Sequence, residues 1–198
     1  SLQISKGGGK LYTFYGHNEK VITECIKSLD ISIVCFNLDY SPYAVKRDES
    51  IQNLCNKMNV YLLSDHDYYL NPPGTILNGS GNSYQKFTPY YDSAVKQRVQ
   101  VPSNAHHINF TKKQQMRVAN LITLQNAMTK FTKVNPDILV HGGRQHAMQA
   151  LAEALKTQKH YSKTRNDLWM PTSQLSAYIK FGCISIREVY KVFKSNRD

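Results

Sequence analysis

The 198-residue sequence predicts a fold in which an α/β half is followed by an all-α half. The near-continuous apolar run at 31–36 is typical of a strand buried on both faces. Strand-like and helix-like segments alternate up to Leu63, which favours a parallel sheet with right-handed crossovers. From Gln114 onward the apolar residues repeat with helical spacing.

Five elements are expected in the first half. Residues 11–15 are rich in β-formers and end at Gly16, so they predict a strand. Asn18 is expected to cap a helix with the apolar face Val21, Ile22, Cys25, Ile26 and Leu29. The strand at 31–36 is followed by a helix over Arg47–Met58 and by a third strand at 60–63. The apolar face of this second helix consists of Ile51, Leu54, Cys55 and Met58.

Turn-forming segments at 71–74 and 78–82 then interrupt the pattern, and a polar, basic connector is expected from about 96 to 113. Two helical stripes follow, on either side of the Gly142-Gly143 break: first Leu121, Leu124, Met128 and Phe131, then Ala147, Leu151, Ala154 and Leu155. Ser185 and Glu188 form a capping box that opens a last helix. We therefore predict domains at 1–97 and 136–198, joined by a helix-containing connector at 98–135.

The net charge of +11 is concentrated in the second half, where residues 99–198 hold fifteen Lys and Arg against five Asp and Glu. This asymmetry favours a polyanion partner, although a solvated basic surface is the alternative. No apolar run is long enough to span a bilayer, so no membrane partner is expected. The four cysteines lack metal-ligand spacing and are expected to be buried free thiols of an intracellular protein, cytoplasmic or nuclear.

One stretch near the C-terminus has distinctive spacing: Tyr161, Arg165, Thr172, Ser173, Leu175, Ser176, Tyr178, Phe181, Gly182, Ser185 and Arg187. Thr172, Ser173 and Ser176 follow a proline, where a helix is expected to begin, and Gly182 is expected to end it. Hydroxyls and unpaired N–H groups at such a place can hold an anion. Ordinary capping of the helix by Thr172 or Ser173 is the alternative.

This stretch resembles the flavin-binding signature of the DNA photolyase/cryptochrome family. Segments 36–48, 71–90 and 142–144 are also similar to that family and occur in the same order. The resemblance covers nearly the whole chain. It implies a partial Rossmann-like parallel α/β domain, followed by the start of a helical FAD-binding domain.

The resemblance also implies roles for single residues. Tyr161 would contact the phosphate or ribose of FAD, and Arg165 would meet the DNA backbone, with a surface ion pair as the alternative. The pyrophosphate would be held by Thr172, Ser173, Gln174, Leu175 and Ser176. Gln174 stands where many bacterial members have arginine. No catalytic residue and no metal ligand is expected, and the single tryptophan, Trp169, is expected to be a packing residue.

A second chromophore in this family would lie near segment 43–48. Lys46 stands where some folate-binding members place a carboxylate, which disfavours folate and leaves deazaflavin, flavin or no antenna open. Simple surface charge is the alternative explanation for Lys46 and Arg47.

By resemblance, the chain starts near the third strand of the α/β domain, and most of the flavin pocket would lie beyond Asp198. In the family strand order 3-2-1-4-5, the first two strands would separate the strand at 11–15 from the other two. Unpaired strand edges are costly. We therefore expect the first half to be unstable alone, to borrow strands from another chain, or to pair its strands differently.

The resemblance implies a piece of a light-driven, FAD-dependent enzyme that repairs pyrimidine dimers in DNA. Such a piece would be active only with complementary fragments, and self-association with another copy is a further expectation. The alternative is a cryptochrome-like or degenerate module that binds nucleic acid or protein without repair. A nucleotide-binding α/β domain unrelated to light is disfavoured, because Gly7-Gly8-Gly9 precede a strand instead of following one.

Overall fold

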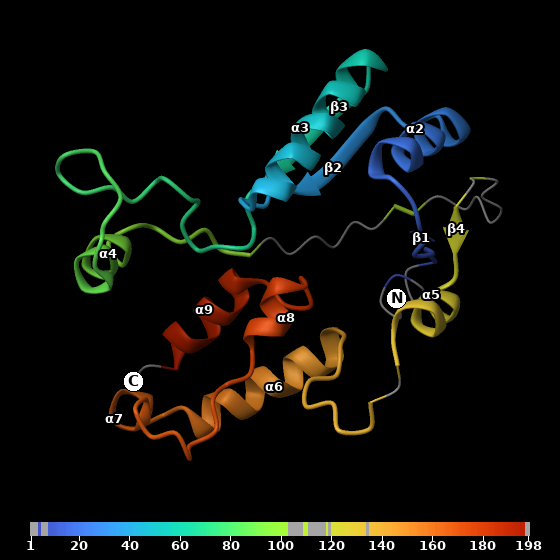
Figure 1. Cartoon of the computed structure of the whole chain (residues 1–198). Helices are drawn as coiled ribbons and strands as arrows, with labels where there is room; N and C mark the ends of the chain where they lie inside the picture. The colour runs from blue at the N-terminus through green and yellow to red at the C-terminus, as the bar shows by residue number, and fades with distance from the viewer. Residues whose placement is uncertain are drawn as a thin grey trace. The chain divides into compact units, whose positions relative to one another are not determined.

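The computed structural model describes Ile4 and residues 8–102, 109–110, 118, 120–133 and 135–196. Within these residues the contacts define two compact units (Figure 1). The α/β unit combines Ser1–Asp65 with Asn104–Pro136, and the helical unit combines His66–Ser103 with Asp137–Asp198. The predicted division at 1–97, 98–135 and 136–198 stays a prediction.

The α/β unit contains a parallel pair of strands, β2 (Ile33–Asn37) and β3 (Tyr61–Asp65), with Ile33 opposite Tyr61. Helices α2 (Asn18–Leu29) and α3 (Pro42–Lys57) pack against them (Figure 1). Their shared core consists of Ile26, Ile51, Cys55 and Val60, with Val34, Phe36 and Leu62 of the strands packed against it. The predicted parallel β-α-β unit is thus confirmed over residues 33–65.

The starts of α2 and α3 both differ from the prediction. Helix α3 begins at Pro42, five residues before Arg47, because Ser41 caps it through a hydrogen bond from the Ala44 N–H (3.3 Å) and proline is favoured at the first helical position. Helix α2 begins at Asn18 itself, and its N-cap residue, His17, makes no side-chain cap bond. The prediction of an Asn18 cap was therefore wrong.

The expected third parallel strand is also wrong. Strand β1 (Thr13–Phe14) pairs antiparallel with β4 (Leu121–Ile122), and the Tyr15 N–H extends the pair by donating to the Asn120 carbonyl at 2.9 Å. For the first half, the sequence left three possibilities: instability alone, borrowed strands, or strands that pair differently. The structure shows the last of these. It also removes Leu121 from the predicted helical stripe. Thr123 caps α5 (Leu124–Phe131), so that helix cannot extend back through it.

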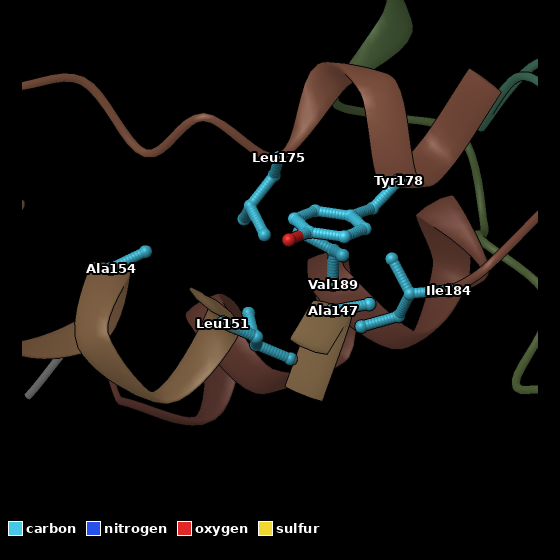
Figure 2. Packing of buried hydrophobic residues seen from close by; sticks show 7 residues of the cluster. All are labelled: Ala147, Leu151, Ala154, Leu175, Tyr178, Ile184 and Val189. Atoms are coloured by element: carbon cyan, nitrogen blue, oxygen red, sulfur yellow. The ribbon is translucent and has the colours of Figure 1, made fainter. Parts of the chain in front are cut away.

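The helical unit is built from α4 (Phe87–Ala94), α6 (Arg144–Thr157), α7 (Tyr161–Thr164), α8 (Ser176–Lys180) and α9 (Ile186–Ser195). Figure 2 shows side chains of α6 and of the α8–α9 region pointing toward one another. The buried cluster consists of Ala147, Leu151, Ala154, Leu175, Tyr178, Ile184 and Val189. This cluster confirms three of the four residues of the predicted apolar face of α6, Ala147, Leu151 and Ala154, whereas Leu155 is half-buried outside it.

A charged pair joins the start of α6 to the start of α9. Arg144 donates to both carboxylate oxygens of Glu188, at 2.9 and 2.6 Å, and to the Cys183 carbonyl at 3.4 Å. Glu188 also accepts from the Ser185 N–H, while the Ser185 hydroxyl accepts from the Arg187 N–H at 3.2 Å. The predicted capping box is therefore present, and it positions Glu188 for the contact with Arg144.

The cysteines are free, as expected, but they are not all buried. Cys55 is buried, Cys25 and Cys183 are half-buried, and Cys35 is exposed because its face of the sheet carries no helix. Burial raises the pKa of the Cys25 and Cys55 thiols. No helix among the described residues is long and apolar enough to cross a membrane.

Candidate functional site

The helical unit contains an open pocket of about 340 Å³ between α6 and the segment that leads into α8. Its lining residues are Leu139, Val140, Ala150, Glu153, Ala154, Thr157, Pro171, Thr172, Ser173, Gln174 and Tyr178. The pocket therefore combines apolar lining residues with a polar segment, residues 172–176, which we call the rim. This combination is typical of small-molecule sites, and the volume lies near the lower end of their usual range of roughly 300–1,000 Å³.

The backbone of the rim has an unusual conformation. Gln174 has a positive φ of 50°, and the next residue, Leu175, is right-handed helical with φ −82° and ψ −15°. Successive residues of opposite hand turn their N–H groups toward one side and form an anion-binding concavity. Within the described part of the chain, none of the N–H groups from Ser173 to Ala177 donates to an acceptor. These groups are therefore available to a ligand.

Leu175 holds this backbone in place, because its side chain is buried in the cluster with Tyr178 and Leu151 (Figure 2). The other end of the rim is fixed by Gln158, whose side-chain N–H donates to the Pro171 carbonyl at 2.8 Å. The rim thus lies between two fixed points. A rigid rim lowers the cost of ordering a site around a ligand.

Helix α8 begins at Ser176, later than the sequence suggested. Its N-cap residue is Leu175, which makes no side-chain cap bond, so the alternative of ordinary capping by Thr172 or Ser173 is also wrong. The positive φ at Gln174 explains the delay, because it interrupts any helix that would start at Thr172. Gly182 ends the short helix as predicted, with a φ of 64°.

The structure brings together only part of the predicted set. Thr172, Ser173 and Gln174 line the pocket, whereas Leu175 is buried in the cluster outside the lining and Ser176 begins α8 at the surface. Tyr161 begins α7 and is exposed outside the pocket lining. Arg165, directly after α7, is exposed.

Three residues of α6 in the pocket wall were not singled out from the sequence: Ala150, Glu153 and Thr157. Their spacing of three and four residues places them on one helix face, next to the predicted apolar stripe. The signal was present, but it could not be distinguished from an ordinary solvated face. Glu153 is exposed and pairs with Lys156 at 3.7 Å, which moderates its repulsion of an anion in the pocket.

Trp169 also differs from the prediction. It was expected to be a packing residue, but its side chain is 95 % exposed. The reason is local: Trp169 lies in a tight turn between α7 and the rim, away from the buried cluster.

Comparison with known proteins explains this architecture. The DNA photolyase family profile matches residues 2–107, more than half of the chain. The chain is 27% identical to Cryptochrome-1 of Aedes aegypti, over 95% of this chain and 38% of that protein. It is also 27% identical to the deoxyribodipyrimidine photo-lyase of Alkalihalophilus pseudofirmus, over 94% of this chain and 40% of that protein.

The fold is similar to that of an archaeal photolyase from Sulfolobus tokodaii, with a TM-score of 0.70 and 22% identity over 97% of this chain and 40% of that chain. The protein is therefore a member of the DNA photolyase family. The chain spans about 40% of the length of these two sequence relatives.

Proposed function

We propose that the rim at 172–176 binds the pyrophosphate of FAD. The observation that carries this proposal is the run of N–H groups from Ser173 to Ala177 that lack an acceptor in the described structure, beside a pocket of about 340 Å³. A pyrophosphate carries several acceptor oxygens and negative charge, which suit such a group of donors. The Sulfolobus tokodaii photolyase structure contains two FAD molecules.

The residues present fit part of FAD. The hydroxyls of Thr172 and Ser173 can donate to phosphate oxygens, and the Gln174 side chain can donate a neutral hydrogen bond. The apolar lining residues can cover uncharged parts of the ligand. Bound FAD would supply the light-driven electron transfer, and the residues of this chain would hold and orient it. Tyr161 is a further candidate for the phosphate or ribose.

We favour a function in which the chain is part of a light-driven DNA repair enzyme. Arg165 would then contact the DNA backbone. The basic second half and the photo-lyase relative support it. The cryptochrome relative is equally similar, at 27% identity, so a cryptochrome-like function without repair is the second candidate. We further propose that complementary segments or a second copy of the chain are its partners. The free cysteines favour an intracellular location.

An antenna chromophore stays a proposal for segment 43–48. In the structure Tyr43 and Lys46 are exposed, while Asp48 is buried and accepts from the Arg47 guanidinium at 2.6 Å. The exposed aromatic ring and cation leave a surface on which a planar anionic chromophore can lie. The Sulfolobus tokodaii structure is described as implying a novel light-harvesting cofactor.

A flavin titration tests the main proposal. The purified chain is mixed with FAD, passed through gel filtration and examined for near-ultraviolet and blue absorbance. We expect Gln174→Arg to tighten FAD binding by about tenfold, because it adds a charge-assisted bond to phosphate. Gln174→Glu, the matched control of opposite charge, should weaken binding by a similar factor.

Equal FAD affinity in the wild type and both variants would exclude a phosphate near Gln174. A repair assay with a pyrimidine-dimer oligonucleotide under blue light then separates the two candidate activities. It is run with and without the segments of a relative that this sequence does not cover. Dimer loss supports the photolyase function. Flavin binding with no dimer loss supports the cryptochrome-like function.

A further inference from the structure

The turn at Asp167–Met170 presents two large apolar side chains to solvent. The Met170 N–H donates to the Asp167 carbonyl at 3.2 Å, which closes a four-residue turn with Leu168 and Trp169 at its centre. Leu168 is 99 % exposed and Trp169 is 95 % exposed. The central positions of turns usually carry Gly, Pro, Asn, Asp or Ser. Neither residue contributes to a buried cluster in the described structure, so packing does not explain them.

Hydrogen bonds hold this turn in one shape. One Asp167 carboxylate oxygen accepts from the Trp169 N–H at 3.0 Å, and the Asp167 N–H donates to the Thr164 carbonyl at 2.9 Å. Beyond the turn, Gln158 anchors the Pro171 carbonyl. The indole is therefore carried on a backbone that is already ordered, which lowers the entropic cost of a contact there.

Positive charge precedes the turn in the sequence. Residues 153–170 contain four Lys or Arg against two acidic residues. Lys156 pairs with Glu153, whereas Lys159, Lys163 and Arg165 are exposed and form no ion pair with a described residue. Exposed cations that lie close in the sequence to an exposed aromatic ring are the residue types with which proteins bind single-stranded nucleic acid, because cations contact phosphates and rings stack on bases.

We propose that the turn at Asp167–Met170 binds single-stranded DNA, with an unpaired base stacked on the indole of Trp169. Lys159, Lys163 and Arg165 then contact the neighbouring phosphates. Arg165 lies four residues from Trp169, which limits their Cα separation to about 14 Å and keeps both within a few nucleotides. The choice of DNA rests on the proposed function, but the stacking contact does not depend on the flavin pocket.

Trp169 reports on this contact directly, since it is the only tryptophan in the chain. The experiment titrates the 198-residue protein with a twelve-nucleotide oligodeoxythymidine and follows tryptophan fluorescence at several salt concentrations. We expect saturable quenching of the emission, because a stacked base shields and quenches the indole. Anisotropy of a labelled oligonucleotide gives the affinity independently of the tryptophan.

Matched variants separate stacking from charge. Trp169→Ala should weaken binding by about fivefold to a hundredfold, whereas Trp169→Phe, which keeps a ring, should stay within about threefold of the wild type. Arg165→Ala should reduce the slope of log affinity against log salt by about 0.7. Both positions are exposed, so far-ultraviolet circular dichroism and thermal unfolding should not change in any of the three variants.

Two results would overturn the proposal. One is DNA binding that neither quenches Trp169 nor responds to Trp169→Ala, which would put the DNA path elsewhere. The other is a blue shift of the emission that grows with protein concentration in the absence of DNA, which would mean that a second copy covers the turn. FAD absorbance is measured in the same samples. Normal flavin binding with either result removes only this proposal and leaves the flavin site standing.

Discussion

The hydrophobic cores of the two units are covered by secondary structure in different ways. In the helical unit, α6, α8 and α9 surround a cluster of seven buried residues. In the α/β unit, α2 and α3 lie on one face of the β2–β3 pair, over a cluster of four buried residues. The other face carries Ile33, Tyr61 and Leu63, which are 53 %, 66 % and 55 % exposed. In the structure, burial of the two parallel strands is therefore confined to one side.

The comparison also separates two kinds of sequence information. A helical stripe predicts which face is buried, because only one face is apolar. A continuous apolar run such as 31–36 predicts that both faces of a strand can be buried. It does not predict that the chain has elements to pack on each face. For this reason the sequence predicted burial on both faces of β2, and the structure shows it on one.

The largest effect should come from the centre of the helical cluster. Leu151 is 2 % exposed, so Leu151→Ala should leave a cavity and lower the free energy of unfolding by about 2–5 kcal/mol. Urea denaturation followed by circular dichroism measures the change. The control is Leu168→Ala, a truncation at a fully exposed site, with an expected effect below about 0.5 kcal/mol. Similar losses for the two variants would mean that the helical cluster is not the stabilising core of this unit.

Elements with local signals were predictable from the sequence. The face of α6, the capping box at Ser185 and Glu188, and the end of α8 at Gly182 depend on residues within a few positions of one another. The pairing of β1 with β4 was missed, because it joins residues more than a hundred positions apart and each strand has only two residues. No local pattern specifies such a pair.

The candidate site shows the same division. The sequence placed Thr172, Ser173 and Gln174 at a ligand site, and the structure puts them on the rim of a pocket. It could not indicate that α8 starts only at Ser176, because that depends on the positive φ of Gln174 and the burial of Leu175. The sequence also did not predict the exposure of Trp169, since tryptophan is usually a packing residue.

A smaller effect should come from the charged link in the helical unit. Hydrogen bonds from Arg144 hold the pKa of Glu188 below its ordinary value of 4.5, while the pKa of Arg144 is raised. The folded state therefore binds a proton at Glu188 less readily than the unfolded state. This stabilisation is present above about pH 4.5 and is lost as the pH falls through the folded pKa.

Glu188→Gln should accordingly lower the free energy of unfolding by about 1–2 kcal/mol at pH 7. The loss is smaller than for a fully buried ion pair, because Arg144 is partly exposed. The variant should also lose part of the acid dependence, which urea denaturation at pH 3 to 7 measures. Glu153→Gln, in the exposed pair with Lys156, is the control and should change stability by less than about 0.5 kcal/mol. An unchanged pH profile in Glu188→Gln would show that another carboxylate governs acid unfolding.

The smallest effect is expected on the uncovered face of the sheet, and neighbouring residues provide the test. Ile33 points away from the helices and Val34 packs against their cluster. Ile33→Thr keeps the β-branched shape that suits a strand, so it should change the free energy of unfolding by less than about 0.5 kcal/mol. Val34→Thr places a hydroxyl in the apolar layer and should cost about 1–2 kcal/mol. Equal costs at the two positions, measured by urea denaturation, would mean that β2 is covered on both faces in solution. The apolar run at 31–36 would then have been the better guide to this strand.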